Sequence, residues 1–296
     1  MTEKKRTEPD WQDVRVFLAL GRYGSLSAAA RALSATHSTI SRRLRSLEAT
    51  LGENLVERRP GGYVLTPAGE HALAAASDME TAVQTLGRGA ATDGSPRGLV
   101  RVNAPPGLSQ GFLIGKLARL PAQHPGLDID LATDLRSVSL ERHVTDIAVR
   151  LDHPKDGDVI AKPLGQMGFG FYGTRALCKQ VEAGAEPVFV GFDEANAYLP
   201  EAIWLARHFP RARLVFRANN QVAQATAATA GIGIALLPHY IGRTTPKLQP
   251  CTLSFSAPSR EIWLLIRRQD RKDVPIRIVA DYLQQAFIDA RELFMD

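Results

Sequence analysis

Apolar residues recur every three or four positions through the first part of the chain, a spacing that predicts helices. A first helix is expected over residues 11–22, and a short alanine-rich helix over residues 27–33, with Ser27 as its cap. A third helix follows, with Thr36 as its N-cap and Gly52 as a C-terminal stop. Its apolar stripe lies on Ile40, Leu44, Leu47 and Leu51.

The third expected helix is polar and basic on the surfaces that its apolar stripe leaves free. These side chains are His37, Ser38, Thr39, Ser41, Arg42, Arg43 and Arg45. In a helix-turn-helix, two helices are joined by a tight turn, and the second helix enters the DNA major groove. A second helix that is polar at its front and basic behind is typical of this motif. An ordinary amphipathic helix with a solvated basic face is the alternative.

Two short alternating runs come next. Residues 54–58 and 63–66 surround Arg59-Pro60-Gly61-Gly62, which predicts a hairpin, or wing. Thr66-Pro67 then pairs a cap with a proline at the first helical position. An alanine-rich helix is expected over residues 68–86, with a narrow apolar seam on Leu73, Ala76, Met79 (or Glu80), Val83 and Leu86. A long helix with such a seam usually packs on another helix, so we expect a partner chain here.

A Gly/Ser/Pro segment over residues 87–98 is the best domain boundary. Beyond it, strand and helix patterns alternate, which predicts βαβ units and a mostly parallel sheet. Strands are expected near residues 99–104, 127–131, 146–151, 168–172, 187–192, 213–216, 232–237 and 261–267. Helices are expected near residues 112–120, 138–143, 202–208, 221–230 and 276–293.

Composition narrows the class of protein. The 296 residues suggest about two domains, 45% of them are hydrophobic, and the net charge of +5 permits nucleic-acid binding. The chain shows neither a secretory signal nor an apolar run long enough for a membrane span. Cys178 and Cys251 are too few for a disulfide scaffold or a metal cluster, and two reduced, buried thiols are expected. A redox switch between them would need a proximity that sequence does not reveal.

An ordered set of residues in the first 69 positions resembles the winged helix-turn-helix of the LysR-type transcriptional regulators. The matching residues are Phe17, Gly24-Ser25-Leu26-Ser27, Ala29-Ala30, Leu33, Ile40-Ser41-Arg42, Leu44, Leu47-Glu48, Leu51-Gly52, Leu55, Glu57-Arg58 and Leu65-Thr66-Pro67-Ala68-Gly69. The resemblance implies a DNA-binding domain over residues 1–69, a dimerisation helix over 67–88 and a flexible linker over 89–98.

The same resemblance implies which side chains meet DNA. They are Ser27, Thr36, His37, Ser38, Thr39, Ser41, Arg42, Arg45, Arg58 and Arg59. Arg42 is a candidate for a bidentate contact with guanine, whereas Arg43 and Arg45 are expected to meet phosphate or solvent. The family usually has Gln-Pro where this chain has His37-Ser38, and a more basic wing where it has Gly61-Gly62. A basic tail, Lys4-Lys5-Arg6, is a candidate for extra phosphate contacts.

Residues 99–296 resemble the family's effector domain, an α/β fold of two lobes like the periplasmic binding proteins. Its markers are the runs at 146–150 and 231–238. The expected lobes are about 99–163 with 267–296, and about 164–266. In open α/β sheets, ligands lie beyond the carboxyl ends of strands. The candidate effector-binding residues there are Gly107, Leu108, Ser109, Thr133, Arg150, Asn219 and Asn220. They suit a carboxylate, with Arg150 as the counter-ion, although Ser109 and Asn220 also fit as helix caps.

The sequence therefore predicts a cytoplasmic, ligand-responsive transcriptional regulator that binds operator DNA as a homodimer or homotetramer. RNA polymerase is a further candidate partner, and a membrane is not. We find no catalytic or metal-binding motif and expect no cofactor. Two alternatives stay open, a solute-binding protein with an incidental helical domain and an architectural DNA binder whose effector domain binds nothing.

Overall fold

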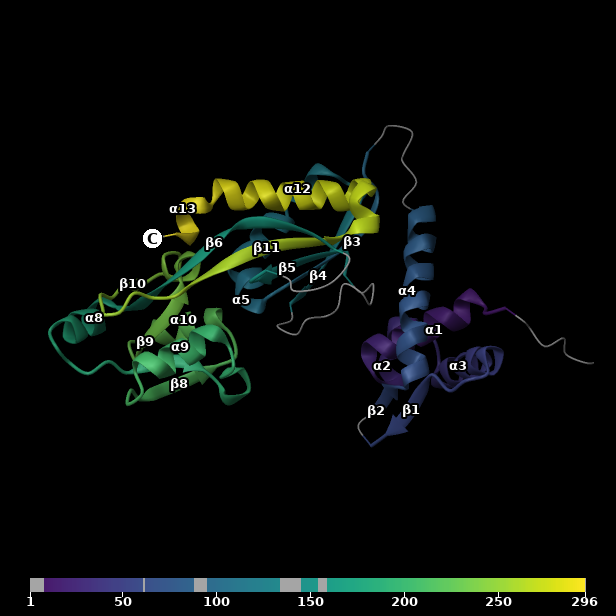
Figure 1. Ribbon diagram of the computed structural model, residues 1–296, viewed down its shortest axis with the longest axis horizontal. Coiled ribbons are helices and arrows are strands. Elements are labelled where there is room, and N and C mark those ends of the chain that lie inside the picture. Colours follow the sequence, from purple (N-terminus) through teal and green to yellow (C-terminus); the bar gives the residue numbers. More distant parts are fainter. Residues whose placement is uncertain (1–7, 61, 88–94, 134–144, 154–158, 296) are drawn as a thin grey trace, which may run out of the picture. The chain divides into compact units, whose positions relative to one another are not determined.

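The computed structural model describes residues 8–60, 62–87, 95–133, 145–153 and 159–295 (Figure 1). The chain divides into two compact units, one formed by the described residues up to 87 and one by those from 95 onward. Each unit is described by itself. The expected helix near 138–143 and the tail Lys4-Lys5-Arg6 lie outside the described residues. No described helix is long and apolar enough to cross a membrane.

The first unit has four helices and a hairpin in its described part. Its elements are α1 (Trp11–Tyr23), α2 (Leu26–Ala32), α3 (His37–Leu51), β1 (Val56–Arg59), β2 (Gly62–Leu65) and α4 (Pro67–Gly87). These bounds confirm the predicted order and lie within a few residues of the predicted ranges.

The cap of α2 was predicted at the wrong serine. Gly24 ends α1 in the left-handed conformation with φ of 66°, so the chain is already extended at Ser25. The Ser25 hydroxyl therefore accepts the hydrogen bond from the Ala28 N–H, at 3.2 Å. Ser27 lies inside the first turn of the helix instead.

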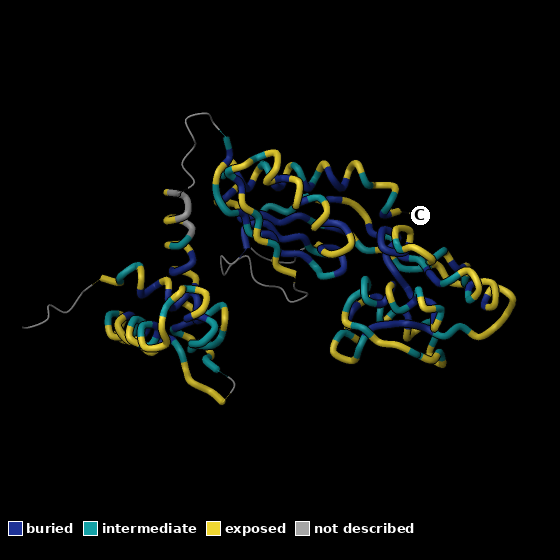
Figure 2. Tube along the Cα trace, turned by 180° about the vertical axis from the view of Figure 1, so that it is seen from behind, coloured by how far each residue is buried: buried dark blue, intermediate teal, exposed yellow. Residues whose placement is uncertain are grey.

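The three short helices enclose one apolar core. Phe17, Ala29, Ile40 and Leu55 are almost completely buried in it. Figure 2 colours the buried stretches of the chain dark blue. Leu51 was predicted to belong to this core, but its side chain is 44% exposed. It lies in the last turn of α3, where Gly52 with φ of 78° turns the chain away.

The hairpin and the start of α4 are locked onto this core by close backbone contacts. Tyr63 N–H donates to the Gly24 carbonyl at 2.8 Å, and Thr66 Oγ1 accepts from the Gly69 N–H at 2.9 Å. Gly69 lies so close to the Leu55 carbonyl that a Cβ there would be 1.9 Å from the oxygen. Only glycine fits this approach, which fixes where α4 leaves the domain.

The second unit alternates strands and helices. Its strands are β3 (Gly98–Ala104), β4 (Leu127–Thr133), β5 (Ile147–Leu151), β6 (Val159–Thr174), β7 (Phe189–Phe192), β8 (Leu214–Ala218), β9 (Ile234–Pro238), β10 (Leu248–Pro250) and β11 (Ser259–Arg267). Its helices are α5 (Pro106–Leu108), η1 (Ser109–Leu113), α6 (Ile114–Leu117), α7 (Leu120–Gln123), α8 (Arg175–Glu182), η3 (Glu194–Asn196), α9 (Pro200–His208), α10 (Gln221–Ala228), α11 (His239–Gly242), η4 (Arg268–Lys272), α12 (Val274–Asp289) and α13 (Arg291–Phe294).

The sheet consists of two halves that share one long strand. The strand order is β4-β3-β5-β11-β6-β9-β7-β8, with β10 also paired to β6. The first part of β6 pairs with β11, and its residues 169–172 pair with β9. We call the half with β3, β4 and β5 lobe I, and the half with β7, β8 and β9 lobe II. The parallel pairs lie inside each lobe, while β6 and β11 run antiparallel to their neighbours.

Several elements differ from the predicted ones. β6 extends over 16 residues, far beyond the predicted 168–172, because it is the strand that connects the lobes. The helix expected at 112–120 begins already at Pro106. Residues 262–266 pair with β5 and so belong with lobe I, whereas the predicted boundary lay near residue 267. α8, β10 and α11 were not predicted.

Candidate DNA-binding and effector-binding sites

A tight turn joins α2 to α3 and sets the start of the reading helix. The Thr36 hydroxyl accepts a hydrogen bond from the Thr39 N–H at 3.2 Å, so Thr36 is the N-cap, as predicted. Ile40, Leu44 and Leu47 bury the inner face of α3 against α1 and α2. Packing of the inner face against the core therefore sets the orientation of α3, and with it the direction in which the outer face points.

The outer face of α3 carries the side chains predicted to read DNA. His37, Ser38, Arg42 and Arg45 are exposed, and Thr39 and Ser41 are half-buried. Their spacing of three and four residues places them along one side of the helix. Among the described contacts, Arg45 donates from Nε to the Ser41 carbonyl at 3.2 Å. Ser27, in the first turn of α2, is half-buried.

Arg43 differs from its neighbours on α3 because it pairs with a buried carboxylate of α1. Its Nη1 lies 2.9 Å from Oδ1 of Asp13, whose side chain is only 8% exposed. This ion pair connects α3 to α1. The Arg43 side chain stays 32% exposed in this pair, so its predicted contact with phosphate or solvent stays a prediction.

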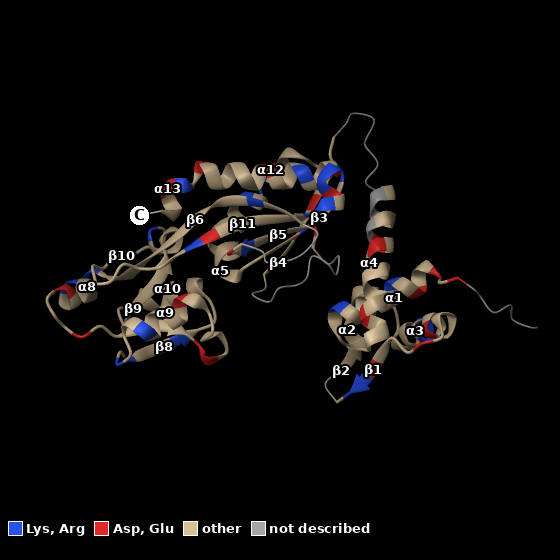
Figure 3. Ribbon diagram, viewed as in Figure 1, with Lys and Arg blue, Asp and Glu red and all other residues tan. Residues whose placement is uncertain are grey.

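The wing carries its charge on one strand. Arg58 and Arg59 are exposed on β1, and the end of this strand is blue in the ribbon of Figure 3. Arg59 also lies 3.4 Å from Glu57 in an exposed ion pair. Such pairs are weak, so Arg59 stays available to a phosphate.

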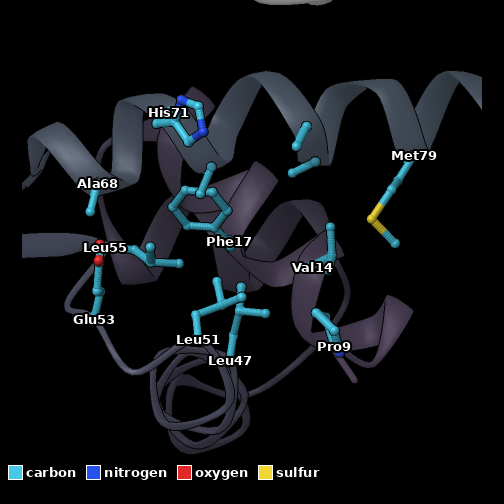
Figure 4. A pocket seen from close by; sticks show the side chains of 13 residues that line it. Pro9, Val14, Phe17, Leu47, Leu51, Glu53, Leu55, Ala68, His71 and Met79 are labelled. Atoms are coloured by element: carbon cyan, nitrogen blue, oxygen red, sulfur yellow. The ribbon is translucent and has the colours of Figure 1, made fainter. Parts of the chain in front are cut away.

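An apolar groove runs along α4 where this helix faces α1 and α3 (Figure 4). Its volume is about 360 Å³. Ala68, Ala72, Ala75 and Met79 line it from α4. Phe17, Leu47, Leu51 and Leu55 are among the residues on the opposite wall.

The apolar stripe of α4 continues beyond this groove with side chains that the described part of the first unit leaves exposed. Val83 is 40% exposed and Leu86 is 85% exposed. Glu80 pairs with Arg22 of α1, so it faces the domain. The seam therefore continues through Met79, and the buried Ala76 lines the groove as well. Leu73, which was predicted to share the seam, is buried against α1 instead.

In the second unit, the predicted effector-binding residues fall into two groups. Gly107 lies at the junction of the lobes, since a Cβ there would be 2.5 Å from Oε1 of Gln221 in α10. Asn220 caps α10 by accepting from the Ala223 N–H at 2.9 Å, and Asn219 beside it is exposed. The structure thus brings Gly107 close to the start of α10, as a site between two lobes requires.

The other predicted residues lie in different surroundings. Leu108 and Ser109 are buried, and the Ser109 hydroxyl donates to the Ala104 carbonyl at 3.2 Å, so it holds backbone. Arg150 is half-buried and donates to the carbonyls of Val149 and Asn103, at 2.9 and 3.3 Å. Thr133 is exposed at the end of β4.

Sequence reasoning missed a chain of polar side chains at the lobe junction. Arg260 of β11 reaches Asp152 of lobe I at 2.7 Å and Glu201 of lobe II at 3.2 Å. Glu201 is only 3% exposed and also accepts from Nε2 of Gln221 at 2.9 Å. Burial, and then the nearby Glu201 carboxylate, raise the pKa of the Tyr240 hydroxyl. Glu201 follows a proline at a helix start, where a carboxylate is normally exposed, so the sequence gives no sign of its burial.

Within the described residues, no three His, Cys, Asp or Glu side chains are arranged to hold a metal ion. The predicted site residues gather in two places, the outer face of α3 with its wing and the junction of the lobes.

Comparisons with known proteins agree with this geometry. Residues 11–70 match the model of the bacterial regulatory helix-turn-helix proteins of the lysR family, and residues 93–288 match the model of the LysR substrate binding domain. The Mau operon transcriptional activator of Paracoccus denitrificans is 27% identical over 280 residues, which cover 95% of this chain and 97% of that protein. The transcriptional activator AaeR of Escherichia coli is 24% identical over 298 residues, 95% of each chain.

Among solved structures, ArgP from Mycobacterium tuberculosis is similar in fold, with a TM-score of 0.66 at 19% identity. The match covers 95% of this chain and 98% of that one. The two family models together span most of the residues. The chain therefore belongs to the LysR family of bacterial transcriptional regulators, with an N-terminal DNA-binding domain and a C-terminal effector-binding domain.

Proposed function

We propose that the outer face of α3 reads operator sequence in the major groove while the wing contacts the DNA backbone. The observation that carries this proposal is the exposed row of His37, Ser38, Arg42 and Arg45 on a helix whose inner face is fixed by the core. Arg42 is assigned a guanine and Arg45 a phosphate, since Arg45 lies further along the helix from its N-terminus.

Arg42→Ala is expected to lower the preference for the operator over unrelated DNA by about 1–3 kcal/mol, because a bidentate base contact is lost. Arg45→Ala, the matched control, is expected to weaken binding about equally on all sequences and to reduce the salt dependence by about one ion. Titration of operator and random duplexes at several salt concentrations measures both. A uniform loss for both variants would mean that the reading face is placed wrongly.

We also propose that α4 holds the protein as a dimer. The groove beside α4 and the exposed Val83 and Leu86 form one continuous apolar stripe, and its alanines allow another helix to approach closely. A second copy of α4, running antiparallel, fits this stripe because the same surface then serves both partners.

The effector domains have a surface for further pairing. β4 and β8 are the outermost strands in the described sheet order. β4 exposes Asp128 and Asp130, whereas Arg213 and Arg217 are exposed on and beside β8. In a two-fold arrangement of two effector domains, the acidic β4 edge of each copy would lie beside the basic β8 edge of the other. Together with the dimer contact through α4, this pairing supports the proposal of a tetramer.

Arg217→Asp is expected to reduce the mass of the assembly in solution by about half, since it places like charges at both contacts. The second change Asp130→Arg is expected to restore the larger assembly. Arg211→Asp, an exposed charge change outside the strand, is the control. Sedimentation velocity of the three variants measures the mass of each assembly. An unchanged mass for Arg217→Asp would exclude these two edges as the contact between effector domains.

The effector is proposed to bind at the lobe junction, near Gly107, Arg150 and the start of α10, as a small carboxylate. We propose a binding rather than a catalytic role there, since the relatives are named as transcriptional regulators. Action on chromosomal DNA would place the protein in the bacterial cytoplasm, with RNA polymerase as a candidate partner. If Arg150→Ala left every response in cells unchanged, the alternative of an architectural DNA binder would gain support.

A further inference from the structure

Two cysteines that are far apart in sequence meet in lobe II. Cys178 lies on α8 and is 0% exposed, and Cys251 directly follows β10 and is 5% exposed. Each thiol is an interaction partner of the other. Both are reduced in this structure.

The strand pairing fixes where the Cys251 side chain points. β10 runs antiparallel to β6, with Gln249 opposite Gly173. Cys251 continues this ladder, because its N–H donates to the Phe171 carbonyl at 2.8 Å. Side chains two residues apart in a strand share a face, so Cys251 lies on the same face as Gln249 and Gly173.

Helix α8 covers this face and brings Cys178 to it. A Cβ on Gly173 would be 3.1 Å from Cys178 Sγ, so the thiol occupies the space that glycine leaves. Cys178 Sγ also lies 3.8 Å from the Gln249 carbonyl oxygen. One turn later, Oε1 of Glu182 accepts from the Thr252 N–H at 3.0 Å. The helix is thus held on both sides of Cys251.

From this geometry we propose that Cys178 and Cys251 form a redox-active dithiol, which a low-molecular-weight disulfide oxidises to an intramolecular disulfide. The bond would connect α8 to the end of β10. Since β10 pairs with β6, the strand shared by both lobes, the cross-link would fix α8 against the lobe II end of that strand.

The reaction balances as two thiol–disulfide exchanges. Cys251, the more accessible thiol, loses its proton and attacks the small disulfide, whose S–S bond breaks and releases one thiol. Cys178 then loses its proton and attacks the Cys251 sulfur, which releases the second thiol. The protein loses two electrons and two protons, and the small disulfide is reduced to two thiols.

The burial of both thiols makes this exchange slow but does not prevent it. Burial raises the pKa of the Cys178 thiol, and burial together with Cys178 raises the pKa of Cys251 to about 12. The thiolate is the nucleophile, so the rate of exchange at neutral pH is low. As long as the pH stays below that pKa, each increase of one pH unit raises the rate about tenfold.

Full-length protein incubated with glutathione disulfide at mildly alkaline pH, below its melting temperature, tests the proposal. The expected product is a monomeric chain lighter by two hydrogen atoms, with the peptides of Cys178 and Cys251 linked in a non-reducing digest. Because the bond closes a loop of 73 positions, the melting temperature of the effector domain is expected to increase by about 10 °C.

Two single variants distinguish this path from random oxidation. Cys178→Ser is expected to stop at a mixed disulfide of Cys251 with glutathione, whereas Cys251→Ser is expected to leave Cys178 free. Two thiols that persist in the native protein, glutathione on both cysteines, or disulfides between chains would each overturn the proposal.

Discussion

The double variant Val83→Asp/Leu86→Asp is expected to be a folded monomer that has lost high-affinity operator binding. Both side chains are exposed in the isolated chain, at 40% and 85%, so aspartate at these positions leaves the core intact. In the proposed dimer they lie in the apolar seam, where unpaired carboxylates are strongly unfavourable. Loss of the second half-site contact lowers affinity by about 100-fold or more, because the two domains no longer bind as one unit.

Sedimentation velocity and operator titration measure this effect, and far-UV circular dichroism checks the fold. Ala74→Asp is the control, since it adds one carboxylate to an exposed position on the opposite side of α4. The control is expected to remain dimeric and to bind normally. A double variant that remains dimeric and binds like the wild type would show that α4 does not form the dimer.

Arg267→Met is expected to destabilise the effector domain by about 3–5 kcal/mol, because it leaves two buried carboxylates without their cation. Arg267 is 5% exposed in β11 and lies 3.3 Å from Asp146 and 2.5 Å from Asp270. It also donates to the Thr145 carbonyl at 3.2 Å. Arg271→Met makes the same chemical change at an exposed site nearby and is expected to have an effect within about 0.5 kcal/mol.

The pH dependence of the Arg267→Met variant has a definite sign. Burial raises the pKa of Asp270 in the wild type, while Arg267 lowers it. Without Arg267 the pKa in the folded state rises further above the unfolded value of about 3.9, so the folded state binds more protons than the unfolded state. The stability of the variant therefore falls as the pH rises from the unfolded-state pKa of Asp270 through its folded-state pKa. Its loss of stability relative to the wild type is expected to be larger at pH 7 than at pH 5. Urea unfolding followed by tryptophan fluorescence at both pH values measures this difference in stability. A loss of stability that does not depend on pH would mean that the carboxylates are not the cause.

Local rules explain which parts of the first domain were predictable. Thr36 and Gly52 occupy positions that require a particular chemistry or backbone angle, and the structure confirms both. Ser25 and Ser27 offer the same hydroxyl, and only the left-handed Gly24 decides between them. The spacing of residues in α3 does not reveal that Arg43 pairs within the domain, because its partner Asp13 is 30 positions away in the sequence.

Long-range contacts explain what remained hidden in the second domain. The alternating pattern predicted most strands, but the length of β6 depends on pairing with both β11 and β9. Ser109 looked like a ligand contact and is a buried backbone anchor. No pattern in the sequence singles out Glu201 or Arg260, because only the contact between α9 and β11 makes them a pair.

Protection of DNA from cleavage is the most direct test of sequence-specific operator recognition by this protein. Purified full-length protein is bound, at a stated salt concentration, to the DNA upstream of its own gene. The expected footprint has two half-sites related by a dyad, with centres one helical turn of about 10 base pairs, or a multiple of it, apart. Salt-sensitive coating of the fragment without discrete protection would contradict the claim and favour an architectural DNA binder.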